Sequence, residues 1–482
     1  MATPIPSNQC EFTLAEVVEA TGGQLFAATS ILARGGGVRG VSIDTRSIAR
    51  GALFVALRGV TSDGHDYLAQ AAELGAAAAI VEVGRRNPAL DCIEVADTLE
   101  ALGSLARRHL TRMRAAHPLP VIAIGGAVGK TTTKELTAAV VRALFGATLS
   151  TPGNLNNLIG VPMTIFTLTG EHRAAVLECG TNTRGEIPRL ARIVEPDAAM
   201  VLNVDLEHTE GLGTLEDVAN EEAALFSTAK HYAVASADEA MVLSRIPKHL
   251  KKITFGLSAD ADVRLAHREA GARTRVRIDI APAMVAQDVD RFIQTEITLL
   301  GEAAALNCTA AIAGLAAMRT SPFESRDLEA IARVLASVNP VAGRLATISV
   351  HDILVIDDTY NSNPRSIRAA LSAAREVAYR LGARLVVAMG DMLELGAMAP
   401  GAHQGAVREV LSERIAAFVA VGPEMRAALN VIAGATLPSN VFVADDSVAA
   451  GKVLKGLLSS GDVLLLKGSR GLAMERALAA LR

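Results

Sequence analysis

Tryptophan is absent from the 482 residues, and aromatic residues of all kinds make up only 3% of the chain. Alanine and glycine are abundant instead, so we expect the helices to pack closely through small side chains. No block of lysine or arginine occurs, and the formal net charge is −4. Without a basic patch, the sequence gives no reason to expect nucleic acid as a partner.

Long apolar runs are also missing, since none approaches the roughly 20 residues that a membrane span needs. The first nine residues are polar and contain proline, and they lack the basic-then-apolar order of a signal peptide. We therefore expect a cytoplasmic protein without membrane insertion. The four cysteines, Cys10, Cys92, Cys179 and Cys308, lie far apart with no CxxC spacing, which favours reduced, packed thiols.

The length predicts about three domains of ordinary size. Half of the residues are hydrophobic and a fifth are charged, as is typical of globular proteins with sizeable cores. Proline-containing breaks near 115–120 and 337–340 read as linkers. We predict domains at 1–116, 117–338 and 339–482.

Strand and helix patterns alternate in the second and third segments, so the predicted fold class is α/β. The second segment opens with the apolar run 121–124, and further runs follow at 174–178 and 198–203, which predicts a parallel sheet. The stretch 262–300 has more alternating β pattern, and a helix is expected at about 302–318. In the third segment, helices separate strands predicted at 353–357, 384–389, 417–421, 440–443 and 462–466, which indicates a doubly wound, Rossmann-like domain.

A glycine-rich turn, Gly125-Gly-Ala-Val-Gly-Lys-Thr-Thr132, lies between a buried-type strand and a helix, as a phosphate loop requires. Ile124 stands where the full motif has its first glycine, so this is a shorter variant. Lys130 can neutralise phosphates, and the Thr131 hydroxyl can hold Mg²⁺. The alternative is an ordinary turn with a surface lysine. The residues expected to cradle a nucleotide are Gly126, Ala127, Val128, Gly129, Lys130, Thr131 and Thr132.

Two further side chains follow strands of the central segment. Glu178 ends the run 174–178, and His208 comes shortly after the run 198–203. Ligands of α/β sheets bind at the carboxyl ends of the strands, and Mg²⁺ prefers hard oxygen ligands. Glu178 and His208 are therefore candidate metal ligands, although either residue could instead be a helix cap or a solvated loop residue.

Taken together, the motifs resemble those of the Mur ligases over almost the whole chain. The most distinctive are in the third segment, at Asp357-Asp-Thr-Tyr-Asn-Ser-Asn-Pro364, Gly390-Asp-Met-Leu-Glu-Leu-Gly396 and Lys467-Gly-Ser-Arg-Gly471. Asp44-Thr-Arg-Ser47 in the first segment and Gly153-Asn-Leu-Asn-Asn157 in the second are also similar. The resemblance implies a central P-loop ATPase domain between a UDP-sugar-peptide-binding domain and a C-terminal domain that closes over both substrates.

The resemblance also implies the activity. A ligase of this kind uses ATP to join D-alanyl-D-alanine to a UDP-linked muramoyl tripeptide through an acyl phosphate, in the last cytoplasmic step of peptidoglycan precursor synthesis. We expect ATP and Mg²⁺ as cofactors and a monomer; the third peptide residue, lysine or diaminopimelate, stays open. By resemblance, Lys130, Glu178 and His208 are catalytic; Asn307 and Arg344 join the loop in binding ATP; Thr131, Glu178, His208 and Glu222 hold metal; and Asp44, Thr45, Arg46, Ser47, Asn157, Asn361 and Asn363 contact substrate.

Some positions depart from the family pattern. Gly125 and Ala127 stand where relatives usually have hydroxyl residues, and Ala303-Ala304 replace a His-Asn pair on the adenine side. Glu222 stands where relatives have a carbamoylated lysine that holds a second Mg²⁺, so it is either a shorter metal ligand or a solvated helix glutamate. These departures leave two alternatives to an active ligase of this specificity. One is a nucleotide-binding paralogue without turnover, and the other is a ligase for a folate or an amino-acid polymer.

Overall fold

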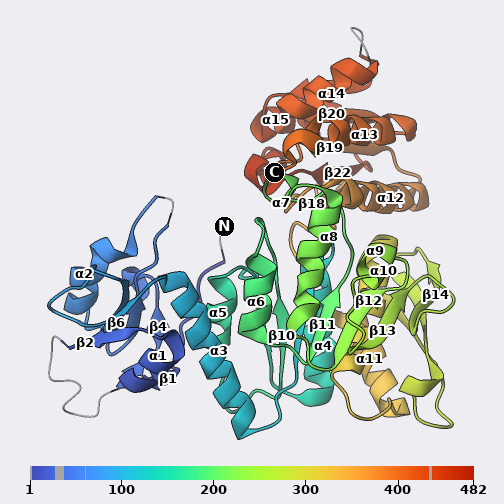
Figure 1. The fold of residues 1–482 in the computed structure, drawn as a ribbon. Coiled ribbons are helices and arrows are strands. Elements are labelled where there is room, and N and C mark those ends of the chain that lie inside the picture. Colours follow the sequence, from blue (N-terminus) through green and yellow to red (C-terminus); the bar gives the residue numbers. More distant parts are fainter. Residues whose placement is uncertain (1–2, 28–36, 60, 434–436, 482) are drawn as a thin grey trace.

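The computed structural model describes residues 3–27, 37–59, 61–433 and 437–481, and three α/β parts follow one another along the chain (Figure 1). The first part has a five-stranded sheet in the order β2-β7-β6-β5-β4. Its strands are β2 (Gln24–Phe26), β7 (Asp91–Val95), β6 (Ala78–Glu82), β5 (Leu53–Val55) and β4 (Val41–Ser42). All pair in parallel except β2, which is antiparallel to β7.

Helix α3 (Thr98–Ala116) joins the first part to the second. Asp97 caps its start, where the Asp97 side chain accepts hydrogen bonds from the amides of Leu99 and Glu100. One face of α3 packs on α1 (Leu14–Thr21), and another packs on α5 (Gly160–Ile165) and α6 (Glu186–Val194) of the central part. A single hydrophobic cluster therefore runs through the first part, α3 and one face of the central sheet.

His109 of α3 lies inside this shared core and packs against the rings of Phe12 and Phe166, which also contact each other. Its Nε2 lies 3.1 Å from the carbonyl oxygen of Leu168, and its Nδ1 lies 3.2 Å from Nη2 of Arg112. A neutral ring that donates from Nε2 and accepts from the guanidinium at Nδ1 satisfies both contacts. Burial lowers the pKa of His109 to about 4.

We expect this histidine to make the joint sensitive to acid. An unfolded histidine takes up its proton near pH 6.5, so the stabilisation by the neutral ring is present above that pH and is lost as the pH falls towards 4. Relative to pH 7.5, the free energy of unfolding at pH 5 should be lower by about 2 kcal/mol. Urea unfolding at pH 7.5 and pH 5 measures it, and His109→Gln should lose less stability over this interval. An equal loss in both proteins would contradict the prediction.

The central part has a nine-stranded sheet in the order β16-β15-β14-β13-β12-β11-β8-β10-β9. Its strands are β8 (Val121–Gly125), β9 (Thr148–Ser150), β10 (Ala174–Glu178), β11 (Ala198–Val201), β12 (Tyr232–Ser236), β13 (Lys251–Gly256), β14 (Val263–Glu269), β15 (Thr274–Ile280) and β16 (Phe292–Ile297). Pairing is parallel up to β14, and β14 to β16 form an antiparallel meander, where the sequence has its alternating pattern. The expected parallel sheet is confirmed.

Alternate residues of the buried strands face opposite layers, as the two-residue period of a strand requires. Val121 and Ala123 face the layer of α3, α5 and α6, whereas Ile122 and Ile124 face α4 (Lys130–Phe145) and α10 (Gly301–Ala317). At Gly314 of α10, a Cβ atom would lie 2.7 Å from the Met200 side chain, so helix and sheet approach through a residue without a side chain. The expected packing through small residues is found here.

The C-terminal part has six strands in the order β17-β18-β22-β19-β20-β21. They are β17 (Ala346–Val350), β18 (Ile353–Asp358), β22 (Val463–Lys467), β19 (Leu385–Gly390), β20 (Ala417–Val421) and β21 (Val441–Ala444). Only β17 is antiparallel, and helices α12 (Pro364–Leu381), α13 (Ala399–Ser412), α14 (Pro423–Ala433) and α15 (Ser447–Leu457) connect the others. The doubly wound prediction is confirmed, and this part lies above the central one in Figure 1.

Two further expectations concern the chain as a whole. The four cysteines are free, buried thiols. Among the helices in the described ranges, none combines the length and the apolar character that crossing a bilayer demands.

Candidate active site

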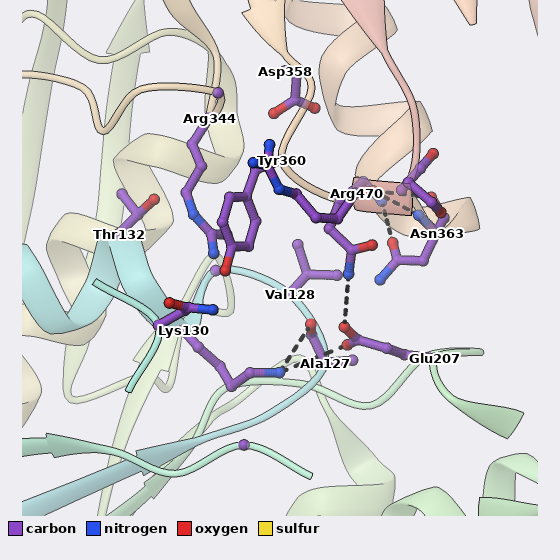
Figure 2. Close-up of a pocket in the computed structure, with 18 of the residues that line it drawn as sticks. Ala127, Val128, Lys130, Thr132, Glu207, Arg344, Asp358, Tyr360, Asn363 and Arg470 are labelled. Atoms are coloured by element: carbon purple, nitrogen blue, oxygen red, sulfur yellow. Dashed lines mark hydrogen bonds and ion pairs between the residues drawn. The ribbon is translucent and has the colours of Figure 1, made fainter. Parts of the chain in front are cut away.

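A cavity of about 440 Å³ lies where the carboxyl ends of the central and C-terminal sheets face each other (Figure 2). The central part contributes the loop 127–130, the segment 154–157 and the ends of β10 and β11. The C-terminal part contributes Arg344 and the loops that follow β18, β19 and β22. The site is therefore completed only by residues from two domains.

The phosphate loop follows β8 and leads into α4. Gly126 and Gly129 have φ values of 117° and 91°, which side chains rarely adopt, so the two glycines are required for this turn. Asn203, just after β11, anchors the loop through hydrogen bonds. Its Oδ1 accepts from the Val128 amide at 2.8 Å, and its Nδ2 donates to the Val128 carbonyl at 2.8 Å. The Ala127 amide also donates to the Asn203 carbonyl at 3.0 Å.

This clamp predicts that Asn203→Ala weakens nucleotide binding. The variant loses two side-chain hydrogen bonds to the loop, each worth about 1 kcal/mol, which together correspond to roughly a tenfold or larger rise in the dissociation constant. Calorimetric titration with ADP measures the effect. Asn430→Ala, at an exposed position of α14, is the matched control and should bind ADP as the parent does. Unchanged affinity in Asn203→Ala would contradict the role of the clamp.

Lys130 begins α4 and points across the loop. Its Nζ donates to the Gly126 carbonyl at 2.5 Å. It also lies 3.7 Å from Oε2 of Glu207, and Figure 2 shows this ion pair. Burial alone lowers the pKa of this ammonium, but nearby carboxylates outweigh burial and hold the pKa above its ordinary value. The carboxylates are those of Glu207, Glu222 and Glu178. Lys130 is thus a charged, partly buried cation at the place where phosphates would bind.

Glu178, at the end of β10, contacts Thr131, the loop residue that follows Lys130. Its Oε1 accepts from the Thr131 hydroxyl at 3.0 Å and from Nδ2 of Asn156 at 2.8 Å. Its Oε2 is buried and has no hydrogen-bond partner among the described residues. Because buried carboxylate oxygens rarely stay unpartnered, a hard cation beside the Thr131 hydroxyl fits this pair of residues. Nη2 of Arg344, from the C-terminal part, donates to the same hydroxyl at 2.9 Å.

His208 and Glu222, the other two candidate ligands, have different partners. Nδ1 of His208 is bonded to the carboxylate of Glu394 from the C-terminal part, and Nε2 lies 3.4 Å from Oε1 of Glu207. Burial lowers the pKa of His208, but the two carboxylates more than compensate and raise it. Glu222 is only 3% exposed, so the interpretation as a solvated helix glutamate is wrong.

In the described ranges, no three His, Cys, Asp or Glu side chains form a group that could hold a metal ion. The structure therefore does not bring Glu178, His208 and Glu222 together around Thr131, and this ligand set stays a prediction. Of the four proposed metal ligands, Thr131 and Glu178 are the pair that the structure joins by a direct hydrogen bond.

On the C-terminal wall, Asn361 reaches across the seam between the domains. Its Nδ2 donates to Oε1 of Glu207 at 3.3 Å. The Asn363 side chain instead accepts from the Ser366 amide at 2.8 Å and caps α12. The guanidinium of Arg344 lies 4.2 Å from the centre of the Tyr360 ring, which holds it over the cavity (Figure 2). Asn307 of α10 also lines the cavity, beside Gly129.

The candidate substrate residues of the first domain lie outside the cavity. Asp44 caps the short helix η2 (Thr45–Ser47) by accepting from the Arg46 amide at 2.9 Å. The Arg46 side chain also pairs with this carboxylate and lowers the pKa of Asp44. Asn157 does line the cavity, but its Oδ1 accepts from the amides of Ile159 and Gly160 at the start of α5. Asn156, its neighbour, makes the contact with Glu178.

Sequence reasoning assigned no role to several residues that shape the cavity, although Lys467 and Asn156 lie within the motifs that resemble the family. Lys467 ends β22 and is 1% exposed, and its Nζ lies 2.5 Å from Oδ2 of Asp358 and 3.0 Å from the Asn361 carbonyl. A lysine at the end of an apolar strand was the available signal. Asn156 and Asn203 carried no such signal, because asparagine in a loop more often forms turns.

Comparison with known proteins agrees with this geometry. The chain matches three domain families, described as Mur ligase family, catalytic domain (residues 37–110), Mur ligase middle domain (124–315) and Mur ligase, glutamate ligase domain (343–470). UDP-N-acetylmuramoyl-tripeptide–D-alanyl-D-alanine ligases are similar to it. That of Escherichia coli is 33% identical over 98% of both chains, and that of Treponema pallidum is 33% identical over 91% of this chain and 93% of the relative.

Solved structures agree as well. MurF from Acinetobacter baumannii superposes with a TM-score of 0.85 at 29% identity, over 98% of this chain and 99% of the other. MurF from Thermotoga maritima in complex with ADP gives 0.76 at 25% identity, over 92% and 96%. With these matches along nearly its whole length, the chain belongs to the Mur ligase family.

Proposed function

We propose that this chain uses ATP to join D-alanyl-D-alanine to UDP-N-acetylmuramoyl-tripeptide, with ADP and phosphate as the other products. The observation that carries the proposal is the composition of one cavity. Its central wall holds a phosphate loop with a charged lysine, and its opposite wall holds the ion pair of Asp358 with the buried Lys467. The names of the relatives give the substrates, and the shared cavity supplies a place where nucleotide and acceptor can meet.

The chemistry requires activation, because the oxygen of a carboxylate is a poor leaving group. The γ-phosphoryl group of ATP moves to a carboxylate oxygen of the tripeptide, so a new P–O bond forms as the bond to the ADP oxygen breaks. The amine of D-alanyl-D-alanine then attacks the acyl carbon and loses a proton, and phosphate leaves from the tetrahedral intermediate. Each step depends mainly on positioning and on compensation of phosphate charge.

The residues of the cavity suit these needs. Lys130 brings positive charge to the phosphate loop, where it donates to the Gly126 carbonyl, and Arg344 brings positive charge to the Thr131 hydroxyl. Both side chains are fixed by neighbours before any substrate arrives. Thr131 and Glu178 would hold Mg²⁺, which would offset phosphate charge when bound. The C-terminal loops line the cavity opposite the phosphate loop, where they would limit the access of water to the acyl phosphate.

We assign the remaining roles as part of the same proposal. Residues 1–116 would bind the UDP-sugar peptide, 117–338 would bind ATP, and 339–482 would bind the dipeptide. Asp44, Thr45, Arg46 and Ser47 would contact the UDP-linked substrate, away from the cavity. ATP and UDP-linked precursors are cytoplasmic metabolites, so we expect the enzyme to act there, as a monomer.

A phosphate-release assay with each substrate omitted in turn tests the proposal. Release should require ATP, the UDP-linked tripeptide and D-alanyl-D-alanine together, and mass spectrometry should find the pentapeptide product. Nucleotide binding without product would favour the inactive paralogue. Turnover only with a folate or an amino-acid polymer would favour the third interpretation, and either result would overturn the proposal.

A further inference from the structure

Glu222 makes a contact that a metal ligand does not need. It lies in α8 (Leu215–Ala223), one residue before the helix ends. Its Oε2 accepts a hydrogen bond of 2.6 Å from the amide of Gly126, the first residue of the phosphate loop with a positive φ. Burial raises the pKa of Glu222 to about 6, and Lys130 and the Gly126 amide oppose that rise. The carboxylate thus holds the loop where its backbone first turns.

Gly125 makes room for this contact. A Cβ atom built there would lie 2.9 Å from Oε2 of Glu222 and 3.2 Å from Cδ2 of Leu225. Gly125 does not have a positive φ, so its backbone conformation does not itself require glycine. The space beside it is filled by the Glu222 carboxylate. The two departures from the family pattern at positions 125 and 222 are therefore one feature of the structure.

We propose that Glu222 is a positioning residue of the phosphate loop, which fixes the Gly126 amide before nucleotide binds, and that Gly125 is kept without a side chain to admit it. A hydrogen bond to a carboxylate is shorter and stronger than one between neutral groups, and this one is buried. This hydrogen bond orders the loop at Gly126, as the Asn203 side chain orders it at Val128. The proposal rests on nucleotide binding at this loop, which the proposed function requires.

Two substitutions separate the hydrogen bond from the charge. Glu222→Gln keeps an accepting oxygen and removes the charge, whereas Glu222→Ala removes both. Titration with ADP in EDTA reports the loop without metal. A positioning role predicts that Glu222→Ala binds ADP about tenfold more weakly than Glu222→Gln, and that the same gap persists with Mg²⁺. This binding experiment is independent of ligase turnover, so its result stands whatever the phosphate-release assay finds.

A direct metal ligand predicts a different pattern. In that case Glu222→Gln and Glu222→Ala would bind ADP with equal affinity in EDTA. In the presence of Mg²⁺ both would bind it more weakly than the parent, and to the same extent. This outcome would overturn the proposal. Glu221→Gln is the matched control, because Glu221 is also buried but accepts from the amides of Gly185 and Ile187 instead of the loop. It should bind ADP as the parent does.

Gly125→Ala in the parent gives a second test that does not depend on the folding of Glu222→Ala. The added methyl group should displace the carboxylate and weaken ADP binding by about the same tenfold. Where Glu222→Ala folds, adding Gly125→Ala to it should weaken ADP binding much less. If Gly125→Ala leaves ADP affinity in EDTA unchanged, the pairing of the two positions is excluded.

Discussion

Lys130→Met should lower kcat for phosphate release by about a thousandfold or more at saturating substrate, the size of effect seen when a cation at a transferring phosphoryl group is removed. Methionine has a similar length but no charge. The loss leaves three carboxylates without their cation, namely Glu207, Glu222 and Glu178, which all raise the pKa of Lys130 in the parent. Repulsion between these groups and the phosphates of ATP adds to the loss.

The comparison for this experiment is Lys252→Met, which removes an exposed lysine of β13 far from the loop. It should retain the parental kcat. ADP binding is measured in parallel, so that loss of nucleotide can be separated from loss of turnover. If Lys130→Met keeps its kcat within tenfold of the parent, the loop does not neutralise the transferring phosphate as we propose.

Lys467→Met should produce the largest loss of stability in the C-terminal domain. The ammonium of Lys467 is almost completely buried and contacts Asp358 and the Asn361 carbonyl, so its removal leaves a carboxylate without a cation. Breaking a buried pair from one side costs about 3–5 kcal/mol. Hydrogen exchange at the amides of β18 and β22 in mild urea should report that loss, because both strands end in these residues.

A double-mutant cycle gives the control. Lys467→Met combined with Asp358→Asn removes both charges and should recover part of the stability. Neither Lys467→Met nor the double variant should release phosphate at the parental rate, since both residues line the cavity. Full additivity of the two substitutions would show that the pair does not act as a unit.

The sequence predicted the core of the fold because the strands are contiguous and apolar. The runs 121–124, 174–178 and 417–421 are each buried along their length, and burial on both faces of a parallel sheet requires such runs. The phosphate loop was equally predictable, since its glycines, lysine and threonines are adjacent in the chain. Local patterns fix local structure.

Contacts between distant residues could not be predicted in the same way. Asn203 lies 75 residues from Val128, Glu222 lies 96 residues from Gly126, and His208 meets Glu394 across 186 residues. A side chain of this kind is polar, and its position in the chain does not reveal its partner. For Glu222, the expected choice between a metal ligand and a solvated residue omitted the contact that the fold provides.

The two joints between domains differ in chemistry, and this difference has a mechanical consequence. The α3 joint carries ion pairs such as Arg189 with Glu100, but its interior is apolar and continuous with the cores on both sides, so relative motion there would expose hydrophobic surface. The C-terminal joint includes several polar pairs, among them Arg268 with Glu376 and Asn361 with Glu207, whose partners water can replace. We therefore expect the first two domains to move as one rigid body. Rotation of the third domain alone would let substrates enter and products leave.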